Sequence, residues 1–221
     1  MNNNIEIVAK LYTEERMLNE LKESALSNRL KIWEKEVVSQ LPERAWILNI
    51  GCGMGREAFF LYDMGFKITA IDISEKAIEG AKQIAIEKNR CVEFIKTDGI
   101  DLPFEDNTFD AIIIWNQTFG LFYGEENQLH ILNECHRVLK KNGIISFSGH
   151  SLEFVQQNHP KYVDGKKFYA IADTDCYWEL FTINEIKLLA ERAGFTVLDC
   201  KEGKIYNYAE YNPILHCECS K

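Results

Sequence analysis

Short apolar runs alternate with longer amphipathic stretches along most of the chain. The runs are rich in Ile and Val and cover residues 46–50, 67–72, 92–95, 109–115 and 144–149. Strands buried on both faces of a parallel sheet have this composition, whereas the strands of a one-sided antiparallel sheet alternate apolar and polar residues. The pattern therefore predicts repeated strand–helix–strand units and a parallel α/β sheet with helices on both faces.

Residues 1–41 carry apolar side chains at spacings of three and four, the period of one face of a helix. They predict two amphipathic helices that cap one end of the sheet, ahead of a core at residues 45–149. A further helix is predicted over residues 125–139. We expect it to end at Gly143, because the lysines before this glycine favour the negative end of a helix dipole and glycine is the usual terminator.

The last part of the chain changes character twice. Residues 151–181 are irregular and rich in aromatic side chains, and so long a stretch without regular structure is uncommon in a compact domain. We interpret it as a lid or substrate-binding insertion. Thr182 and Glu185 form a capping box for a helix, and the two apolar runs after it are joined by too short a stretch for a crossover helix. Residues 182–221 therefore predict a helix and an antiparallel strand pair.

Length and charge narrow the class of protein. We expect residues 1–221 to form a single domain with one core. The net charge is −9 and no run of Lys and Arg could neutralise a phosphate backbone, which argues against nucleic acid as a partner. No apolar run approaches the ~18 residues of a membrane span, and the N-terminus lacks the apolar core of a signal peptide. We therefore expect no membrane association and a cytoplasmic location.

Seven cysteines are scattered along the chain without a C-x-x-C pair. Cys217 and Cys219 alternate along a predicted strand and could face Cys200 on its neighbour, which leaves open a thiolate site for a metal or arsenic. We favour the alternative that the cysteines are small core side chains in a reducing compartment, and we predict no metal.

The strongest candidate for a binding site is the segment I-L-N-I-G-C-G-M-G-R-E-A, which begins at Ile47. A buried strand here leads through three alternating glycines into a helix, and glycine lets a ligand approach the backbone closely. A dinucleotide fingerprint, G-x-G-x-x-G, would place its third glycine where Arg56 stands. The observed spacing therefore argues against a bound pyrophosphate and for a ligand whose amino-acid end lies across the loop. The loop residues predicted to bind it are Gly51, Cys52, Gly53 and Gly55.

Two acidic residues follow at the ends of the next two strands. Asp72 lies about 20 residues after the first glycine, the separation expected for a carboxylate that binds ribose hydroxyls. Ile73 could then supply an apolar face for an adenine ring. Asp98 and the backbone N–H of Gly99 could bind the adenine amino group and a ring nitrogen.

Two polar residues end the fourth and fifth strands, at the edge where open α/β sheets bind ligands. Asn116 is interpreted as a contact to the cofactor or the substrate rather than as a simple turn residue. His150 could act as a catalytic base, since its ordinary pKa of about 6.5 permits proton removal near neutral pH. A histidine that is only hydrogen-bonded within a loop is an equal alternative.

Over roughly residues 45–149 the chain resembles class I S-adenosylmethionine-dependent methyltransferases. The resemblance rests on the order of four features: the strand, the glycine loop, the two acids and the segment L-P-F…F-D at 102–110. The resemblance implies S-adenosylmethionine as cofactor and S-adenosylhomocysteine as product. It also implies a Rossmann-like α/β fold with a seven-stranded, mostly parallel sheet of order 3-2-1-4-5-7-6, strand 7 being antiparallel. The family usually has Asp or Glu where Asn49 stands, to help hold the methionine ammonium, so Asn49 would make this contact without the charge.

We therefore expect a methyltransferase that acts on a small-molecule acceptor by direct in-line displacement. Residues 115–118 lack the N-P-P-Y-like tetrad of enzymes that methylate amino groups of nucleic acids or protein glutamine. Three alternatives remain: a non-catalytic S-adenosylmethionine-binding protein, another transferase that uses the same cofactor, and an NAD-dependent enzyme on a related fold. The acceptor and the oligomeric state stay open.

Overall fold

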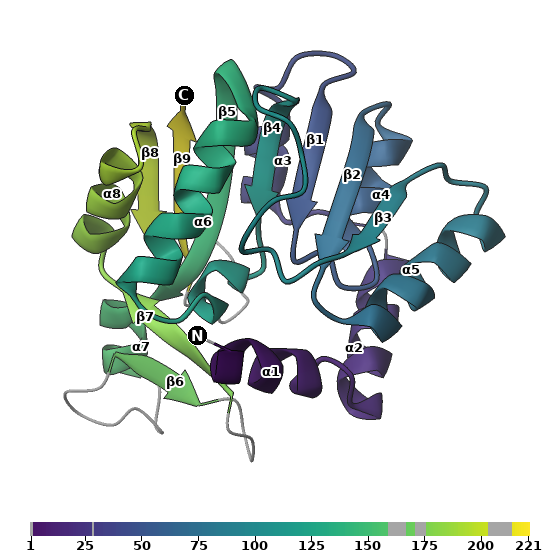
Figure 1. Ribbon diagram of the computed structural model, residues 1–221, viewed down its shortest axis with the longest axis horizontal. Helices are drawn as coiled ribbons and strands as arrows, with labels where there is room; N and C mark the ends of the chain where they lie inside the picture. Colours follow the sequence, from purple (N-terminus) through teal and green to yellow (C-terminus); the bar gives the residue numbers. More distant parts are fainter. Residues whose placement is uncertain (1, 28, 159–166, 171–175, 203–213) are drawn as a thin grey trace.

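The computed structural model describes residues 2–27, 29–158, 167–170, 176–202 and 214–221, and its centre is one mixed sheet (Figure 1). Seven strands lie side by side in the order β3-β2-β1-β4-β5-β9-β8. The pairs from β3 to β5 are parallel, and β9 runs antiparallel to both of its neighbours. The strands are β1 (Trp46–Ile50), β2 (Lys67–Asp72), β3 (Glu93–Lys96), β4 (Phe109–Ile114), β5 (Leu139–Ser151), β8 (Thr196–Glu202) and β9 (Ile214–Ser220).

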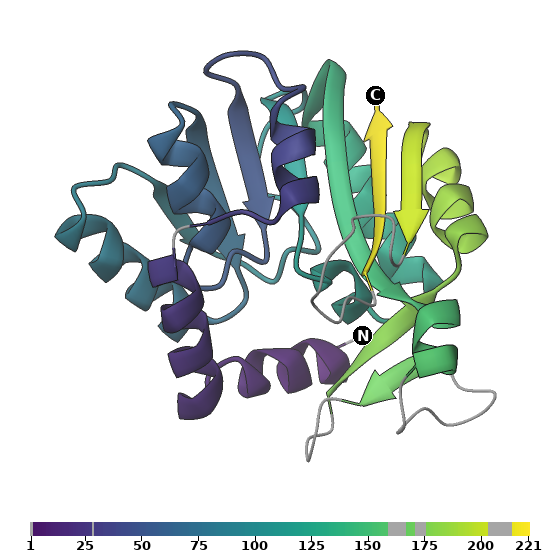
Figure 2. The same ribbon diagram turned by 180° about the vertical axis from the view of Figure 1, so that it is seen from behind.

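Helices cover both faces of the sheet, as predicted (Figures 1 and 2). Successive side chains of a strand point to opposite faces, so Ile47 of β1 enters one core and Leu48 the other. Because β9 and β8 take the places of a seventh and a sixth strand, the expected order 3-2-1-4-5-7-6 is confirmed. The first core is shared with α3 (Ile32–Val38), α4 (Arg56–Asp63) and α5 (Glu75–Glu87), and the second with α6 (Glu125–Val138) and α8 (Ile183–Arg192).

Helix α6 ends, and strand β5 begins, earlier in the chain than the sequence predicted. The strand begins at Leu139, which pairs with Phe109 of β4, so the lysines after α6 belong to β5. Lys140 forms an ion pair with Asp110 at 2.8 Å. The prediction that Gly143 terminates the helix is wrong. This glycine lies within β5, where a Cβ atom would come within 2.9 Å of the Asp110 carbonyl oxygen, so close backbone approach is what requires it.

The N-terminal region forms three helices, where the sequence predicted two. Helix α1 (Asn2–Leu11) lies across the carboxyl ends of the strands, and α2 (Glu15–Ser27) leads from it towards α3 (Figures 1 and 2). The break between α1 and α2 contains Thr13, whose hydroxyl donates to the Lys10 carbonyl oxygen at 2.7 Å. This break lets α1 pass under the sheet edge at which open α/β folds bind ligands.

The segment predicted to be irregular, residues 151–181, contains regular structure. Ser151 begins the helix α7 (Leu152–Asn158), and its hydroxyl oxygen accepts a hydrogen bond from the Phe154 N–H at 3.0 Å. Strand β7 (Tyr177–Phe181) pairs in parallel with the end of β5, and β6 (Phe168–Ala170) pairs antiparallel with β7. The prediction is wrong for these elements, which are too short to show a clear period in the sequence. Residues 159–166 and 171–175 of the predicted lid, and 203–213 before β9, lie outside the described residues.

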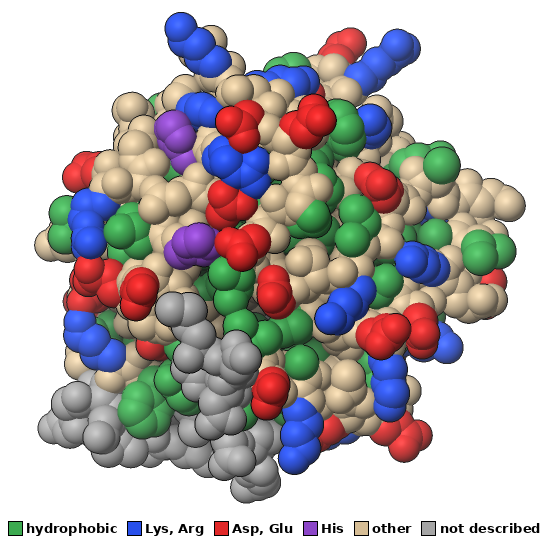
Figure 3. Space-filling view, in the orientation of Figure 1, with side chains coloured by type: hydrophobic (Ala, Val, Ile, Leu, Met, Phe, Trp, Pro, Cys, Tyr) green, Lys and Arg blue, Asp and Glu red, His purple; other side chains and the backbone are tan. Residues whose placement is uncertain are grey.

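Lys and Arg side chains are interspersed with Asp and Glu on the face seen in Figure 3 rather than gathered into a basic stripe. Such an arrangement offers no continuous track for a nucleic-acid backbone on that face. No helix within the described part of the chain has the length and apolar character needed to cross a membrane.

The three C-terminal cysteines lie together in the second core. Cys217 and Cys219 are buried with their Sγ atoms 3.6 Å apart, and Cys200 is the cross-strand partner of Cys217. Over the residues that the structure describes, no group of three or more potential ligands is arranged to hold a metal ion. Their position in the second core is the environment of small apolar side chains.

Candidate active site

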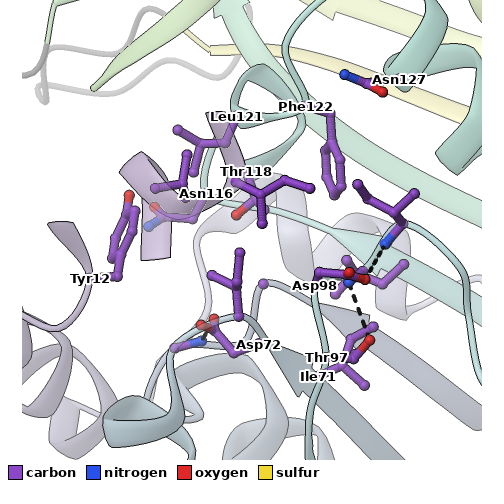
Figure 4. A pocket seen from close by; sticks show the side chains of 18 of the residues that line it. Tyr12, Ile71, Asp72, Thr97, Asp98, Asn116, Thr118, Leu121, Phe122 and Asn127 are labelled. Carbon is purple, nitrogen blue, oxygen red and sulfur yellow. Dashed lines mark hydrogen bonds between the residues drawn. The ribbon is translucent and has the colours of Figure 1, made fainter. Parts of the chain in front are cut away.

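A cavity lies where α1 passes under the carboxyl ends of the strands (Figure 4). It encloses about 950 Å³ of space free of protein atoms, counted out to its open mouth. One wall comes from the strand ends and the loops after them, and the opposite wall from α1 and the 3-10 helix η1 (Thr118–Leu121). The predicted cofactor-binding residues that line it are Gly51, Gly53, Asp72, Ile73, Asp98, Gly99 and Asn116.

The glycine loop leaves β1 at Gly51 and enters α4 a few residues later. The N–H groups of Gly51 and Cys52 both donate to the Ile71 carbonyl oxygen, at 2.9 and 3.0 Å, which folds the loop against β2. Gly51 and Gly53 have φ angles of 72° and 52°, in the left-handed region that favours glycine. A Cβ atom at Gly51 would lie 2.4 Å from Cγ2 of Thr118, so this glycine is also required for the close approach of η1.

Asp72 ends β2 and lines the cavity (Figure 4). Its Oδ2 accepts a hydrogen bond from the Gly53 N–H at 2.7 Å, and its Oδ1 accepts one from the Ser74 N–H at 2.9 Å. The carboxylate thus ties the glycine loop to the start of α5, and each oxygen keeps a lone pair for a ligand. Burial raises the pKa of Asp72, and the hydrogen bonds from Ser74 and Gly53 oppose that rise.

Asp98 and Gly99 follow β3 and line the same cavity. The exposed Asp98 carboxylate accepts a hydrogen bond at Oδ1 from the Ile100 N–H at 3.1 Å. The Gly99 N–H, predicted to meet a ring nitrogen, donates to Oγ1 of Thr97 at 3.3 Å (Figure 4). A hydrogen bond of this length is weak, so an acceptor on a ligand could replace it.

The turn after β4 has a strained backbone. Asn116 and Gln117 are consecutive residues with φ angles of 54° and 62°, a conformation that residues other than glycine rarely adopt. The Gln117 N–H donates to Oγ of the buried Ser148 at 3.1 Å, which fixes the turn. As a result Thr118 lies over Gly51 in the middle of the cavity (Figure 4). Thr118 was not among the site residues predicted from the sequence.

The wall opposite the sheet was not predicted from the sequence either. This wall, which we call the apolar wall, consists of Ile5, Val8, Tyr12, Leu121 and Phe122. No motif marks these residues, and the helical period of α1 indicates only that one of its faces is buried. Burial raises the pKa of Tyr12, so its hydroxyl stays protonated near neutral pH and can donate a hydrogen bond.

Three predicted cofactor-binding residues do not line the cavity. Asn49 is buried in β1 with an exposed fraction of 1%, and its Nδ2 finds no hydrogen-bond acceptor among the described residues. Cys52 packs into the first core, and Gly55 is the N-cap of α4 with a φ angle of 96°. Cys52 and Gly55 therefore support the conformation of the glycine loop without lining the cavity.

His150 does not line the cavity. Its ring packs against Trp178 with 4.9 Å between ring centroids, and its exposed fraction is 8%. Burial and, after it, the nearby Lys31 ammonium lower the pKa of His150 to about 3. An imidazole with so low a pKa accepts protons poorly near neutral pH. The structure thus argues against the predicted role of His150 as a catalytic base.

Known proteins match most of this chain. A family model for the methyltransferase domain matches residues 47–143. The putative methyltransferase YqeM of Bacillus subtilis is 30% identical over 119 residues, which are 54% of this chain and 48% of that protein, so the chain spans about half of its length. Demethylmenaquinone methyltransferase of Staphylococcus aureus is 30% identical over 185 residues, which cover 75% of this chain and 74% of that protein.

Solved structures share the fold. A SAM-dependent methyltransferase from Methanosarcina mazei has a TM-score of 0.71 over 84% of this chain and 96% of that chain, at 21% sequence identity. The matched domain and the Staphylococcus aureus relative show a methyltransferase, which favours methyl transfer over the NAD-dependent and non-catalytic alternatives. The chain therefore belongs to the class I S-adenosylmethionine-dependent methyltransferases.

Proposed function

We propose that the chain transfers a methyl group from S-adenosylmethionine to a small, largely apolar acceptor bound against the apolar wall. This proposal rests on the difference between the two sides of the cavity, one with acidic and the other with apolar side chains. Asp72 and Asp98 lie on the side of the strand ends, whereas Leu121 and Phe122 lie opposite (Figure 4). Val8 of α1 also lines the cavity. A polar nucleoside and an apolar acceptor would thus occupy different sides of one space.

The side of the strand ends suits the nucleoside of the cofactor. Asp72 keeps lone pairs for two ribose hydroxyls, and Asp98 could accept a hydrogen bond from the adenine amino group. Ile73 offers an apolar surface to the adenine ring. When bound, S-adenosylmethionine supplies a methyl group on a sulfonium sulfur, whose charge is lost as the neutral thioether leaves.

The apolar wall would contribute mainly by orientation. In-line transfer requires that the acceptor atom be held in place and that water be kept out. The protonated Tyr12 hydroxyl can bind a polar atom of the acceptor, while Val8 and Leu121 contact its apolar part. The Staphylococcus aureus relative is named for demethylmenaquinone, and we propose an apolar ring compound of that kind here.

Transfer of an isotopically labelled methyl group to a panel of acceptors, followed by mass spectrometry, tests this function. We expect label on an apolar ring compound, with a short-chain reduced demethylmenaquinone tried first. Leu121→Asn should lower methylation by about tenfold or more with little change in S-adenosylhomocysteine affinity, because it puts an amide in the apolar wall. Leu198→Asn, at a residue with an exposed fraction of 52%, is the matched control. Label found only on protein or nucleic acid would contradict a small acceptor.

Replacing Asp72 with asparagine is expected to weaken S-adenosylhomocysteine binding by about tenfold or more, which is roughly 1.4 kcal/mol or more. The amide keeps the size of the side chain but loses the charge that strengthens hydrogen bonds from ribose hydroxyls. Calorimetric titration measures the affinity, with Asp63→Asn as control because Asp63 is paired with Arg90 away from the cavity. If the ribose is the cause, the variant should no longer distinguish the 2′-deoxy ligand from the parent; an equal loss for both ligands would assign Asp72 to loop support instead.

A further inference from the structure

Lys31 brings a positive charge to the end of the cavity beside the glycine loop. It stands directly before α3, and its Nζ lies 3.4 Å from Oδ1 of Asn116, which lines the cavity. Burial is the main cause of the lowered pKa of His150 and the raised pKa of Glu57, and in both cases the Lys31 charge adds a downward effect. Those residues belong to β5 and α4, so both elements lie within range of the Lys31 charge, which stands beside Asn116 at the carboxyl end of β4.

A buried clamp fixes this end of α3 against the glycine loop. The Arg56 guanidinium donates to both carboxylate oxygens of Glu34, at 2.7 and 2.8 Å, and to the Arg29 carbonyl oxygen at 3.1 Å. Glu34 also accepts a hydrogen bond from the Lys31 N–H at 2.7 Å. Arg29 and Glu34, the two residues that Arg56 holds, lie on either side of Lys31 in the chain. Its backbone is therefore held in place, which lowers the entropy lost when its side chain binds a ligand.

Asn49 lacks the negative charge that the family usually places in the glycine-loop motif, and the described acidic side chains near Lys31 do not replace it. Glu34 is fully buried, and both it and Glu57 bind Arg56. Asn49 carries no charge where the family usually has an acid for the cofactor's ammonium, and it does not line the cavity. Among the residues that the structure describes, the charges at this end of the site therefore suit a carboxylate of the ligand better than an ammonium.

We propose that Lys31 binds the α-carboxylate of the cofactor's amino-acid end, and that recognition of this end depends on its carboxylate more than on its ammonium. The Asn116 amide, which contacts Lys31 through Oδ1, has N–H donors for the same carboxylate. Lys31 is a binding residue and touches no reacting atom. The inference rests on S-adenosylmethionine as cofactor and is independent of the acceptor.

The consequence is a selectivity among adenosine thioethers. Removing the carboxylate from S-adenosylhomocysteine leaves an aminopropyl chain whose ammonium would meet the Lys31 ammonium, and like charges repel. Removing the amino group leaves a carboxylate that Lys31 can still bind. Wild-type protein should therefore bind the deaminated ligand nearly as well as S-adenosylhomocysteine and the decarboxylated ligand much more weakly. A site that recognised mainly the ammonium would show the opposite order.

Calorimetric titration of the full chain with these three ligands tests the selectivity without an acceptor. We expect loss of the carboxylate to weaken binding by about thirtyfold or more and loss of the amino group by less than about fivefold. Equal losses, or the larger loss for the deaminated ligand, would overturn the proposal. Binding of neither S-adenosylhomocysteine nor 5′-methylthioadenosine, which lacks the amino-acid end, would overturn the cofactor assignment together with it.

Substitution of Lys31 tests the residue itself. Lys31→Met should weaken S-adenosylhomocysteine binding by about tenfold to a hundredfold and leave 5′-methylthioadenosine binding unchanged, and Lys31→Arg should recover most of the loss. Lys35→Met, at an exposed position of the same helix, is the matched control. Wild-type affinity in the methionine variant, or an equal loss for both ligands, would overturn the assignment. The wild-type ligand series decides the question if the variant does not fold.

Discussion

Replacing Arg56 with methionine is expected to lower the free energy of unfolding by about 3–5 kcal/mol. Arg56 has an exposed side-chain fraction of 11% and forms ion pairs with Glu34 and Glu57, whose exposed side-chain fractions are 0% and 7%. Without the guanidinium, two buried carboxylates would face each other with no cation between them. Urea unfolding of the wild type and the variant measures the difference, and Arg16→Met is the control. The exposed side-chain fractions of Arg16 and Glu20 are 74% and 56%, so loss of this surface pair should cost less than about 1 kcal/mol.

The pH dependence separates lost charge from lost packing in the Arg56→Met variant. Burial raises the pKa of Glu57 even in the presence of Arg56, and removal of the cation should raise it further. A carboxyl group whose pKa is higher in the folded state stabilises the fold at low pH, and this stabilisation is lost as the pH rises through the folded pKa. The variant should therefore lie closest to the wild type near pH 5 and furthest from it near pH 8. A deficit that is the same at both pH values would assign the effect to packing.

The parts of the fold and site that the sequence could predict are those with local causes. Buried parallel strands need continuous apolar runs, so β1, β2 and β4 were visible as Ile-rich segments. The Gly51 loop is set by a backbone conformation that favours glycine, and Asp72 lies at a fixed distance along the chain after it. Both line the cavity, and their binding of the cofactor stays a prediction.

The parts that the sequence could not predict depend on contacts between distant segments. The period of α1 marks Val8 as buried but does not reveal that it faces Leu121 across a cavity. Lys31 becomes a candidate only because the fold brings it to Asn116, 85 residues further along the chain. The choice between the two roles of His150 could not be made from the sequence, because its burial, which lowers its pKa, is decided by β5 and β7 together.

Gly51→Ala is expected to weaken S-adenosylhomocysteine binding by about a hundredfold or more, roughly 2.7 kcal/mol or more. The φ angle of 72° alone would cost an alanine about 1–2 kcal/mol. The added Cβ would also lie 2.4 Å from Cγ2 and 2.8 Å from Oγ1 of Thr118. Thr118 has little freedom to yield, because its side chain is β-branched and the turn before it is fixed through Ser148. Either the glycine loop or η1 must move, and both form walls of the cavity.

Two further variants separate the clash at Gly51 from the backbone strain. Gly65 has a φ angle of 94° and nothing within 4 Å of an added Cβ, so Gly65→Ala should lower stability without changing the S-adenosylhomocysteine affinity measured by calorimetry. Adding Thr118→Ala to Gly51→Ala removes the two nearest atoms and leaves the Thr118 Cβ at 3.1 Å, so the double variant should regain about tenfold in affinity. If the double variant binds S-adenosylhomocysteine no better than Gly51→Ala, the loss of affinity comes from the backbone of the glycine loop. The clash between the added Cβ and Thr118 would then not be its cause.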